Sequence, residues 1–122
     1  MPGLDELFRE LVEVWPKDSA YPIAFDGDGV RFQHGNVSWE RRIFMYPDWS
    51  DIENAAARNI IEDELIRSGC RRLETSIDET GHWAHISRRS FELIGGKQPY
   101  KTRTEALLRV AIQAFTGVRD LP

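Results

Sequence analysis

A wide apolar stripe near the end of the chain constrains the fold more than any other feature of the sequence. Between residues 102 and 117, apolar residues recur at the spacing of an amphipathic helix: Ala106, Leu107, Leu108, Ala111, Ile112 and Phe115. Thr102 and Glu105 have the spacing of a capping box at its start, and Gly117 is predicted to end it. Such a helix is stable only when another layer covers its stripe. The rest of the chain must supply that layer.

Two earlier segments also have helical periodicity. Residues 3–15 alternate an apolar face with an acidic one, and Pro16 follows at once. The next helix is predicted after "YPDWS", where Ser50 and Glu53 form a second capping box, and Gly69 is predicted to stop it. Its apolar residues are Ile52, Ala56, Ile60 and Leu65.

Between these helices, apolar residues recur at every second position, as in strands. The segment "YPIAFDGDGVRFQHGNVSWERRIFMY" predicts three short antiparallel strands, and "LETSIDETGHWAHIS" predicts a β-hairpin with its turn at Asp78 to Gly81. A chain of 122 residues is long enough for one domain and too short for two. The prediction is therefore a single α+β domain over residues 1–122. It has an antiparallel sheet of about five strands with amphipathic helices packed on it, in the order αβββαββα.

Charge and cysteine content limit the class of protein. The single cysteine, Cys70, excludes an intramolecular disulfide and a cysteine-clustered metal site, and no apolar run approaches the length of a membrane span. We therefore expect a cytoplasmic protein that binds no membrane, no metal and no cofactor. The net charge of −4 divides unevenly: residues 1–66 carry −8 and residues 67–122 carry +4. This asymmetry either solvates the two surfaces or forms a bipolar surface that docks a charged partner or a second copy of the chain.

Two stretches resemble metal sites, and the strand prediction argues against both. In "TGHWAHISRR", His82 and His85 are three residues apart, so on a strand they project from opposite faces and cannot share a metal ion. In "FDGDGVRF", Asp26 and Asp28 match the start of a calcium loop, but Val30 stands where a further ligand is needed. A tight hairpin turn explains those glycines better. The alternation fits burial of either hairpin face, the one with Trp83 or the one with Ala84 and Ile86.

Basic residues of the second half could form an anion-binding patch with an aromatic neighbour, the arrangement that phosphate and nucleotide recognition uses. The same residues are also typical of solvated strand edges. A site of this kind would bind a phosphate-bearing nucleotide or nucleic acid. The candidates are Arg72, Arg88, Arg89, Lys97, Tyr100, Lys101 and Arg103.

The segment from Trp49 to Gly117 resembles small phage and prophage proteins of the phage α-β-α sandwich type. The resemblance depends on the helix ending "IRSGC", the strands "LETSID" and "HWAHIS", the variable loop "FELIGGKQPYK" and the closing "TRTEALLRVAIQAF". It implies a phage origin and a location in the host cell cytoplasm. It also implies accessory roles such as host takeover or inhibition of a host defence system, and it supplies no catalytic residue.

We therefore expect a small non-enzymatic protein that binds a host or phage protein. No nucleophile motif, phosphate-binding loop or dinucleotide fingerprint is present in the sequence. A hydrolase built around His82 or His85 is a third, weaker alternative to protein binding and to nucleotide binding. Aromatic side chains dominate interface energetics, so the expected partner-binding residues are Trp39, Tyr46, Trp49 and Trp83.

Overall fold

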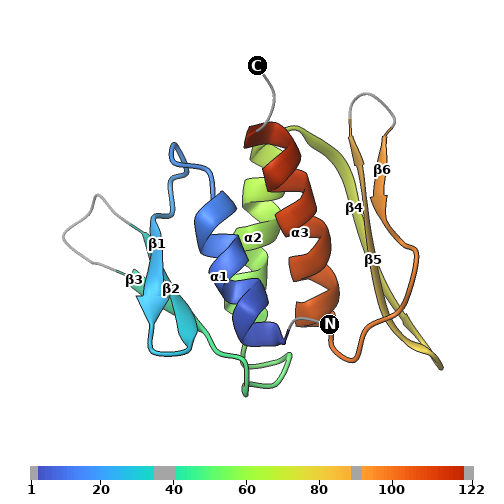
Figure 1. Cartoon of the computed structure of the whole chain (residues 1–122), viewed down its shortest axis with the longest axis horizontal. Coiled ribbons are helices and arrows are strands. Elements are labelled where there is room, and N and C mark those ends of the chain that lie inside the picture. The colour runs from blue at the N-terminus through green and yellow to red at the C-terminus, as the bar shows by residue number, and fades with distance from the viewer. Residues whose placement is uncertain (1–2, 35–40, 89–91, 120–122) are drawn as a thin grey trace.

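Three helices form the middle layer of the molecule, and a three-stranded antiparallel sheet covers each side of that layer (Figure 1). This arrangement comes from a computed structural model, which describes residues 3–34, 41–88 and 92–119. The elements in chain order are α1 (Leu4–Val14), β1 (Ile23–Asp26), β2 (Gly29–His34), β3 (Arg41–Met45), α2 (Ala55–Arg67), β4 (Cys70–Asp78), β5 (Gly81–Arg88), β6 (Leu93–Gly95) and α3 (Arg103–Arg119).

The strands are divided between two sheets, with the orders β1-β2-β3 and β4-β5-β6. The α+β class is confirmed, but the single sheet of about five strands, in the order αβββαββα, is not. The additional strand is β6, which pairs with β5 and lies within "FELIGGKQPYK", the segment expected to be a loop. Three residues are too few to show an alternating pattern. Alternation also shows which residues share a face without showing which strands pair.

The position of α3 explains its wide apolar stripe. This helix contacts α1 and α2 as well as β5 and β6, so apolar neighbours surround most of it. A helix that buried only one face would need a narrower stripe. Within the described residues, no helix has both the length and the apolar character needed to span a membrane. The buried residues of α3 are Ala106, Leu107, Leu108, Val110, Ala111, Ala114 and Phe115.

Trp15 connects the first sheet to the helical layer. Its ring meets Phe32 of β2 and Phe115 of α3 edge to face, each at a centroid distance of 5.4 Å. The indole N–H donates a hydrogen bond of 2.8 Å to the Tyr21 carbonyl. Buried aromatic pairs of this geometry contribute about 0.5–1.5 kcal/mol each beyond the area they bury. The end of α1 is therefore fixed against both of its neighbours.

The predicted α1 is confirmed, and the start of α2 differs slightly from the prediction. Ser50 and Glu53 form both capping-box hydrogen bonds, at 3.1 and 3.3 Å, but the regular helix begins only at Ala55. Ile52 therefore lies in the preceding turns and is 88% exposed, so it is not part of the apolar stripe. The buried apolar face of α2 consists instead of Ala57, Ile60, Ile61 and Leu65.

The predicted stop of α3 at Gly117 is wrong, because the helix continues to Arg119. The Arg88 guanidinium packs against the helix at this glycine. A Cβ atom at position 117 would lie 2.5 Å from Arg88 Nη2, and that same nitrogen donates a 2.7 Å hydrogen bond to the Ala114 carbonyl. Gly117 thus allows an arginine of β5 to pack closely against the helix.

Gly69 ends α2 as predicted, and its replacement by alanine should destabilise the fold. Its φ is +104°, which an L-residue adopts only with strain, and a Cβ atom there would meet nothing within 4 Å. The cost is therefore purely conformational, and we expect Gly69→Ala to lower the free energy of unfolding by about 1–2 kcal/mol. Chemical denaturation followed by circular dichroism measures it. Ser68→Ala, at a neighbour with an ordinary φ of −79°, is the matched control, and equal effects of the two changes would contradict the explanation.

The turn between β1 and β2 is a tight hairpin, as the sequence favoured over a calcium loop. Asp26 pairs with Gly29, which leaves Gly27 and Asp28 as the two turn residues. Gly27 has a φ of +61°, the left-handed conformation that such turns require. The backbone conformation of this turn is therefore sufficient to explain the glycine at position 27, and no bound calcium ion is needed to explain it.

Candidate functional site

Three aromatic rings form a cluster on the outer face of the first sheet. Phe44 belongs to β3, Tyr46 follows that strand, and Trp49 closes the turn after it. The Phe44 and Tyr46 rings are stacked, with centroids 6.1 Å apart, and the Trp49 ring meets Tyr46 edge to face at 4.7 Å. All three residues are only partly buried. We call Phe44, Tyr46 and Trp49 the aromatic cluster.

The alternation of β3 places this cluster on the outside. Met45 is fully buried, so its neighbour Phe44 points away from the helices. Tyr46 lies over Gly29 of β2, where a Cβ atom would come within 2.4 Å of the tyrosine ring. The Tyr46 hydroxyl donates a hydrogen bond to the Asp26 carboxylate of β1. The cluster is therefore anchored across the whole sheet.

Asn54 holds the turn that carries two of the rings. Its side chain is fully buried, and its Oδ1 accepts a 3.1 Å hydrogen bond from the Tyr46 amide. Its Nδ2 donates to the carbonyls of Tyr46, at 3.1 Å, and of Trp49, at 3.4 Å. The Trp49 amide donates back to the Tyr46 carbonyl at 3.2 Å and closes the turn. The positions of Tyr46 and Trp49 thus depend on one buried amide.

Of the four expected partner-binding residues, the structure brings together Tyr46 and Trp49 only. Trp83 lies on β5 of the second sheet, which covers the opposite side of the helical layer (Figure 1). Ala84 and Ile86 of β5 are buried, so Trp83 occupies the outer face of that sheet. Trp39 lies outside the described residues. Phe44 completes the cluster, although it is not among the residues expected from the sequence. Its position next to Met45 on an alternating strand is the sequence feature that indicates an outward-facing ring.

His82 and His85 project from opposite faces of β5, as a strand requires. Because Ala84 is buried, the face of His82 is turned toward the helices, while His85 lies on the outer face, 2.9 Å from the Glu74 carboxylate. His82 exchanges two backbone hydrogen bonds of 2.8 Å with Tyr100. In the described parts of the chain, no group of three or more His, Cys, Asp or Glu side chains is placed to hold a metal ion.

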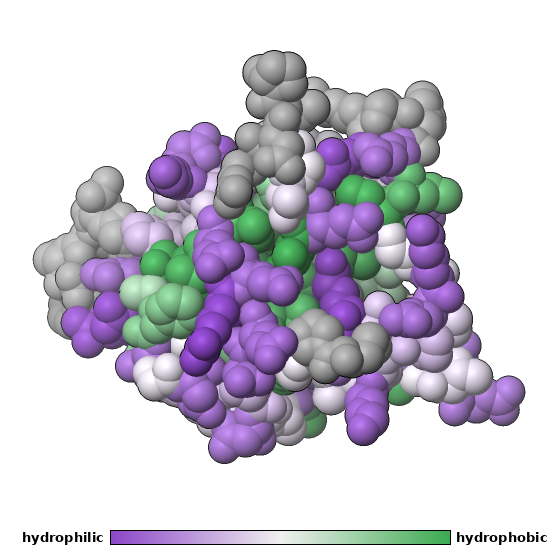
Figure 2. Space-filling model, in the orientation of Figure 1, coloured by the Kyte–Doolittle hydropathy of each residue, from purple (hydrophilic) through white to green (hydrophobic). Residues whose placement is uncertain are grey.

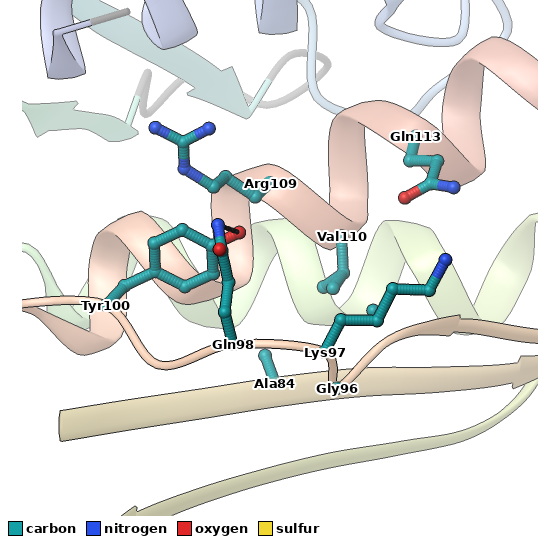
Figure 3. A pocket seen from close by; sticks show the side chains of 9 residues that line it. Ala84, Gly96, Lys97, Gln98, Tyr100, Arg109, Val110 and Gln113 are labelled. Atoms are coloured by element: carbon teal, nitrogen blue, oxygen red, sulfur yellow. Dashed lines mark hydrogen bonds between the residues drawn. The ribbon is translucent and has the colours of Figure 1, made fainter. Parts of the chain in front are cut away.

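Part of the expected anion-binding set converges on one hollow between the second sheet and α3 (Figure 3). Lys97 and Tyr100 line a pocket of about 320 Å³ with Arg109, a helical residue that the sequence analysis missed. The Arg109 guanidinium lies over the Tyr100 ring, 4.8 Å from its centroid. Lys101 lines an adjacent hollow of about 420 Å³ that shares Tyr100 and Arg109. In the sequence, Arg109 stands four residues after Glu105, the spacing that places two side chains on the same helix face. The two side chains are in contact at 3.4 Å in the structure.

The other expected anion-binding residues lie elsewhere. Arg72 forms an exposed ion pair with Glu74 on β4, and Arg88 packs against the end of α3. Arg103 lines a separate hollow with His82 under the end of the β4–β5 hairpin. Arg89 lies outside the described residues. The basic surface is therefore smaller than the sequence suggested, and it lies between α3 and the segment that joins β6 to α3.

Cys70, at the start of β4, is a poor nucleophile. Burial raises the pKa of its thiol, against the opposing effects of the Arg72 backbone and the Arg88 charge. A thiol with a raised pKa is mostly protonated at neutral pH, and only the thiolate attacks electrophiles. Its half-buried position against β5 is consistent with a packing role.

Comparison with known proteins found no family model, no curated protein and no solved structure that matches this chain.

Proposed function

We propose that this protein is a small, non-enzymatic binding protein that docks a partner protein on the aromatic cluster. The observation that carries the proposal is the cluster itself: three adjoining, partly exposed rings on one sheet face, held by Asn54 and Asp26. Aromatic side chains with fixed positions lose little entropy on binding and commonly supply most of an interface's affinity.

The face of the molecule that Figure 2 shows, with the helices in its middle, is a poorer surface for an apolar partner than the aromatic cluster. In Figure 2, hydrophilic side chains predominate over the helices, and apolar surface appears in separate patches instead of one continuous area. The exposed faces of α1 carry Asp5, Glu6, Glu10 and Glu13, in agreement with this view. A hydrophobic contact is therefore less favoured on this face than on the aromatic cluster.

The edge of β3 beside the cluster supports one mode of docking. Because β3 is last in its sheet, that edge has no neighbouring strand among the described residues. The Tyr46 amide and carbonyl both face Asn54, away from β2. Alternate residues of a strand direct these groups to the same side, so those of Phe44 face the open edge as well. We propose that an extended apolar segment of the partner adds to β3 as a further strand.

The biological setting that we propose is the one implied by the resemblance. A phage-type accessory protein of this size would act by occupying a surface of a host or phage protein, for example a component of a defence system. Sheet-edge addition suits such a role, because main-chain hydrogen bonds supply affinity while the rings select the side chains of the segment.

The proposal predicts that Trp49→Ala weakens partner binding by about 30-fold, the effect of removing a central aromatic anchor. The partner is first captured from host lysate through a photo-crosslinking residue at position 52, which is 88% exposed and three residues beyond Trp49. Calorimetry then measures the affinity of the purified partner for the wild-type protein and for the Trp49→Ala variant.

A crosslinking residue at position 93 and the variant Leu93→Ala are the matched controls, because Leu93 is 70% exposed on the other sheet. Strand addition further predicts that the Phe44 amide becomes protected from hydrogen exchange in the complex. A partner that crosslinks equally from both positions, or binds the Trp49 variant with unchanged affinity, would show that the cluster is not the docking surface.

A further inference from the structure

A pocket lies between the second sheet and α3, away from the aromatic cluster (Figure 3). Its floor is apolar and almost completely buried, consisting of Ala84 at 4% and Val110 at 3% exposure. Its rim is polar: the Lys97 side chain extends across it toward Gln113, and Gln98 lies beside Tyr100. The volume of about 320 Å³ is at the lower end of the range for small-molecule sites, roughly 300–1,000 Å³.

Two glycines shape this pocket. Gly95 and Gly96 have φ values of +83° and +74°, and the Gly96 amide donates a 2.9 Å hydrogen bond to the Ala84 carbonyl. A Cβ atom at Gly95 would lie 2.2 Å from Val110 Cγ1. The backbone therefore approaches α3 closely and contributes no side chain of its own at these positions. The following residue, Lys97, is thereby directed along the pocket instead of being buried in it.

The charges around the pocket are mainly positive. Lys97 and Arg109 line it, and Lys101 lies in the adjoining hollow. Among the described residues that line the two hollows, the one acid is Glu105, which contacts Arg109. Of the described carboxylates, none pairs with Lys97. Tyr100 separates the two hollows, and its hydroxyl accepts a 2.9 Å hydrogen bond from Gln98. This local excess of positive charge occurs in a chain whose net charge is −4.

We infer that this pocket binds a small organic phosphomonoester, with the phosphate at Lys97 and Arg109 and the organic part against Ala84 and Val110. An ammonium and a guanidinium are the groups that recognise phosphate, and a mostly buried apolar floor favours an organic part over a free ion. The amides of Gln98 and Gln113 can bond hydroxyl groups of the ligand. The size of the hollow suits a single phosphorylated sugar or nucleoside, and the acidic first half of the chain disfavours a nucleic-acid polymer.

The test uses the full chain and measures the binding of adenosine monophosphate, adenosine and inorganic phosphate by nuclear magnetic resonance titration at low and high salt. We expect adenosine monophosphate to bind most tightly, with shifts in the amides of Gly96, Lys97 and Val110, and binding to weaken as salt rises. Lys97→Gln removes one charge-assisted contact and should weaken binding about tenfold. Lys17→Gln, at an exposed lysine beside the end of α1, is the matched control and should have no effect.

Several outcomes would overturn the inference. Adenosine binding as tightly as its monophosphate would mean that no phosphate site exists, and inorganic phosphate binding as tightly would mean that the apolar floor contributes nothing. Tighter binding of a short RNA would indicate a polymer surface instead. Unchanged affinity of Lys97→Gln, or no binding of any probe, would also overturn it. Partner docking on the aromatic cluster is tested separately by Trp49→Ala, so either proposal can fail alone.

Discussion

Asn54→Ala should lower the free energy of unfolding by about 3 kcal/mol, because the Tyr46 amide and the Trp49 carbonyl lose their hydrogen bonds to a fully buried side chain. The Asn54 side chain is completely buried and satisfies the Tyr46 amide, the Tyr46 carbonyl and the Trp49 carbonyl. Alanine can replace none of these hydrogen bonds, and it also leaves a cavity. Urea denaturation measures the change. For a domain of this size the melting temperature should fall by about 10 °C.

The same substitution should abolish partner binding before the fold is lost. Asn54 fixes the turn between Tyr46 and Trp49, so without it the two rings no longer keep one arrangement. Ile52→Ala is the control within the same segment, since that side chain is 88% exposed, and it should change stability by less than about 0.5 kcal/mol. An Asn54→Ala protein that unfolds at the same urea concentration as wild type would show that the buried amide contributes nothing.

Short-range features of the fold could be predicted from the sequence. The pairs Ser50–Glu53 and Thr102–Glu105 both form capping hydrogen bonds, and Gly69 ends its helix with a positive φ. Each of these features depends on residues within one helical turn of each other, so the local sequence contains all the information needed. The hairpin with its turn before Gly81 is predictable for the same reason.

Long-range pairing could not be predicted in the same way. Both sheets consist of strands with one apolar face, and alternation does not distinguish one sheet of about five strands from two of three. The strand Leu93–Gly95 is recognisable only through its partner β5. One signal was available: α3 is apolar around most of its circumference, which indicates a helix covered on more than one side.

The candidate sites also differ in whether they depend on residues near in sequence or on contacts between distant segments. Tyr46 and Trp49 are near in sequence, and their rings lie together. Trp83 shares with them only its aromatic residue type, and the fold places it on the other sheet. Lys97 and Tyr100 meet Arg109 only because α3 packs against β5 and β6, a contact between distant segments. Residue type therefore identified candidates, and tertiary packing decided which of them share a surface.

Asp51→Ala should lower the free energy of unfolding by about 2–3 kcal/mol at neutral pH, because Asp51 connects the start of α3 to the turns before α2. Its carboxylate accepts hydrogen bonds from the Arg103 amide at 2.9 Å, the Thr104 amide at 3.0 Å and the Thr104 hydroxyl at 2.7 Å. Arg58, which is 8% exposed, lies 3.6 Å from the same carboxylate. Removing the Asp51 carboxylate leaves the Arg103 and Thr104 donors without this acceptor. It also removes the opposite charge beside the mostly buried Arg58 guanidinium, which keeps its hydrogen bonds to the Asp51 carbonyl and the Thr104 hydroxyl. Urea denaturation at pH 7 measures the loss.

The contribution of Asp51 should also depend on pH. Partial burial raises the pKa of this carboxyl, but the hydrogen bonds from Arg103 and Thr104 and the charge of Arg58 together lower it below its ordinary value. A carboxyl whose pKa is lower in the folded state stabilises the fold above its unfolded pKa of about 3.9, and this stabilisation is lost as the pH falls through the folded pKa.

The matched variant for this pH dependence is Asp51→Asn, which keeps the shape of the side chain and one acceptor but cannot ionise. Its stability deficit relative to wild type should therefore be largest at neutral pH and should shrink as the pH falls below about 4. Comparing the two proteins cancels the other carboxylates of lowered pKa, such as Asp18 and Asp78, which both proteins retain. Denaturation curves recorded from neutral to acidic pH measure the deficit. A deficit that stays constant over this range would mean that Asp51 acts through its hydrogen-bond geometry and not through its charge.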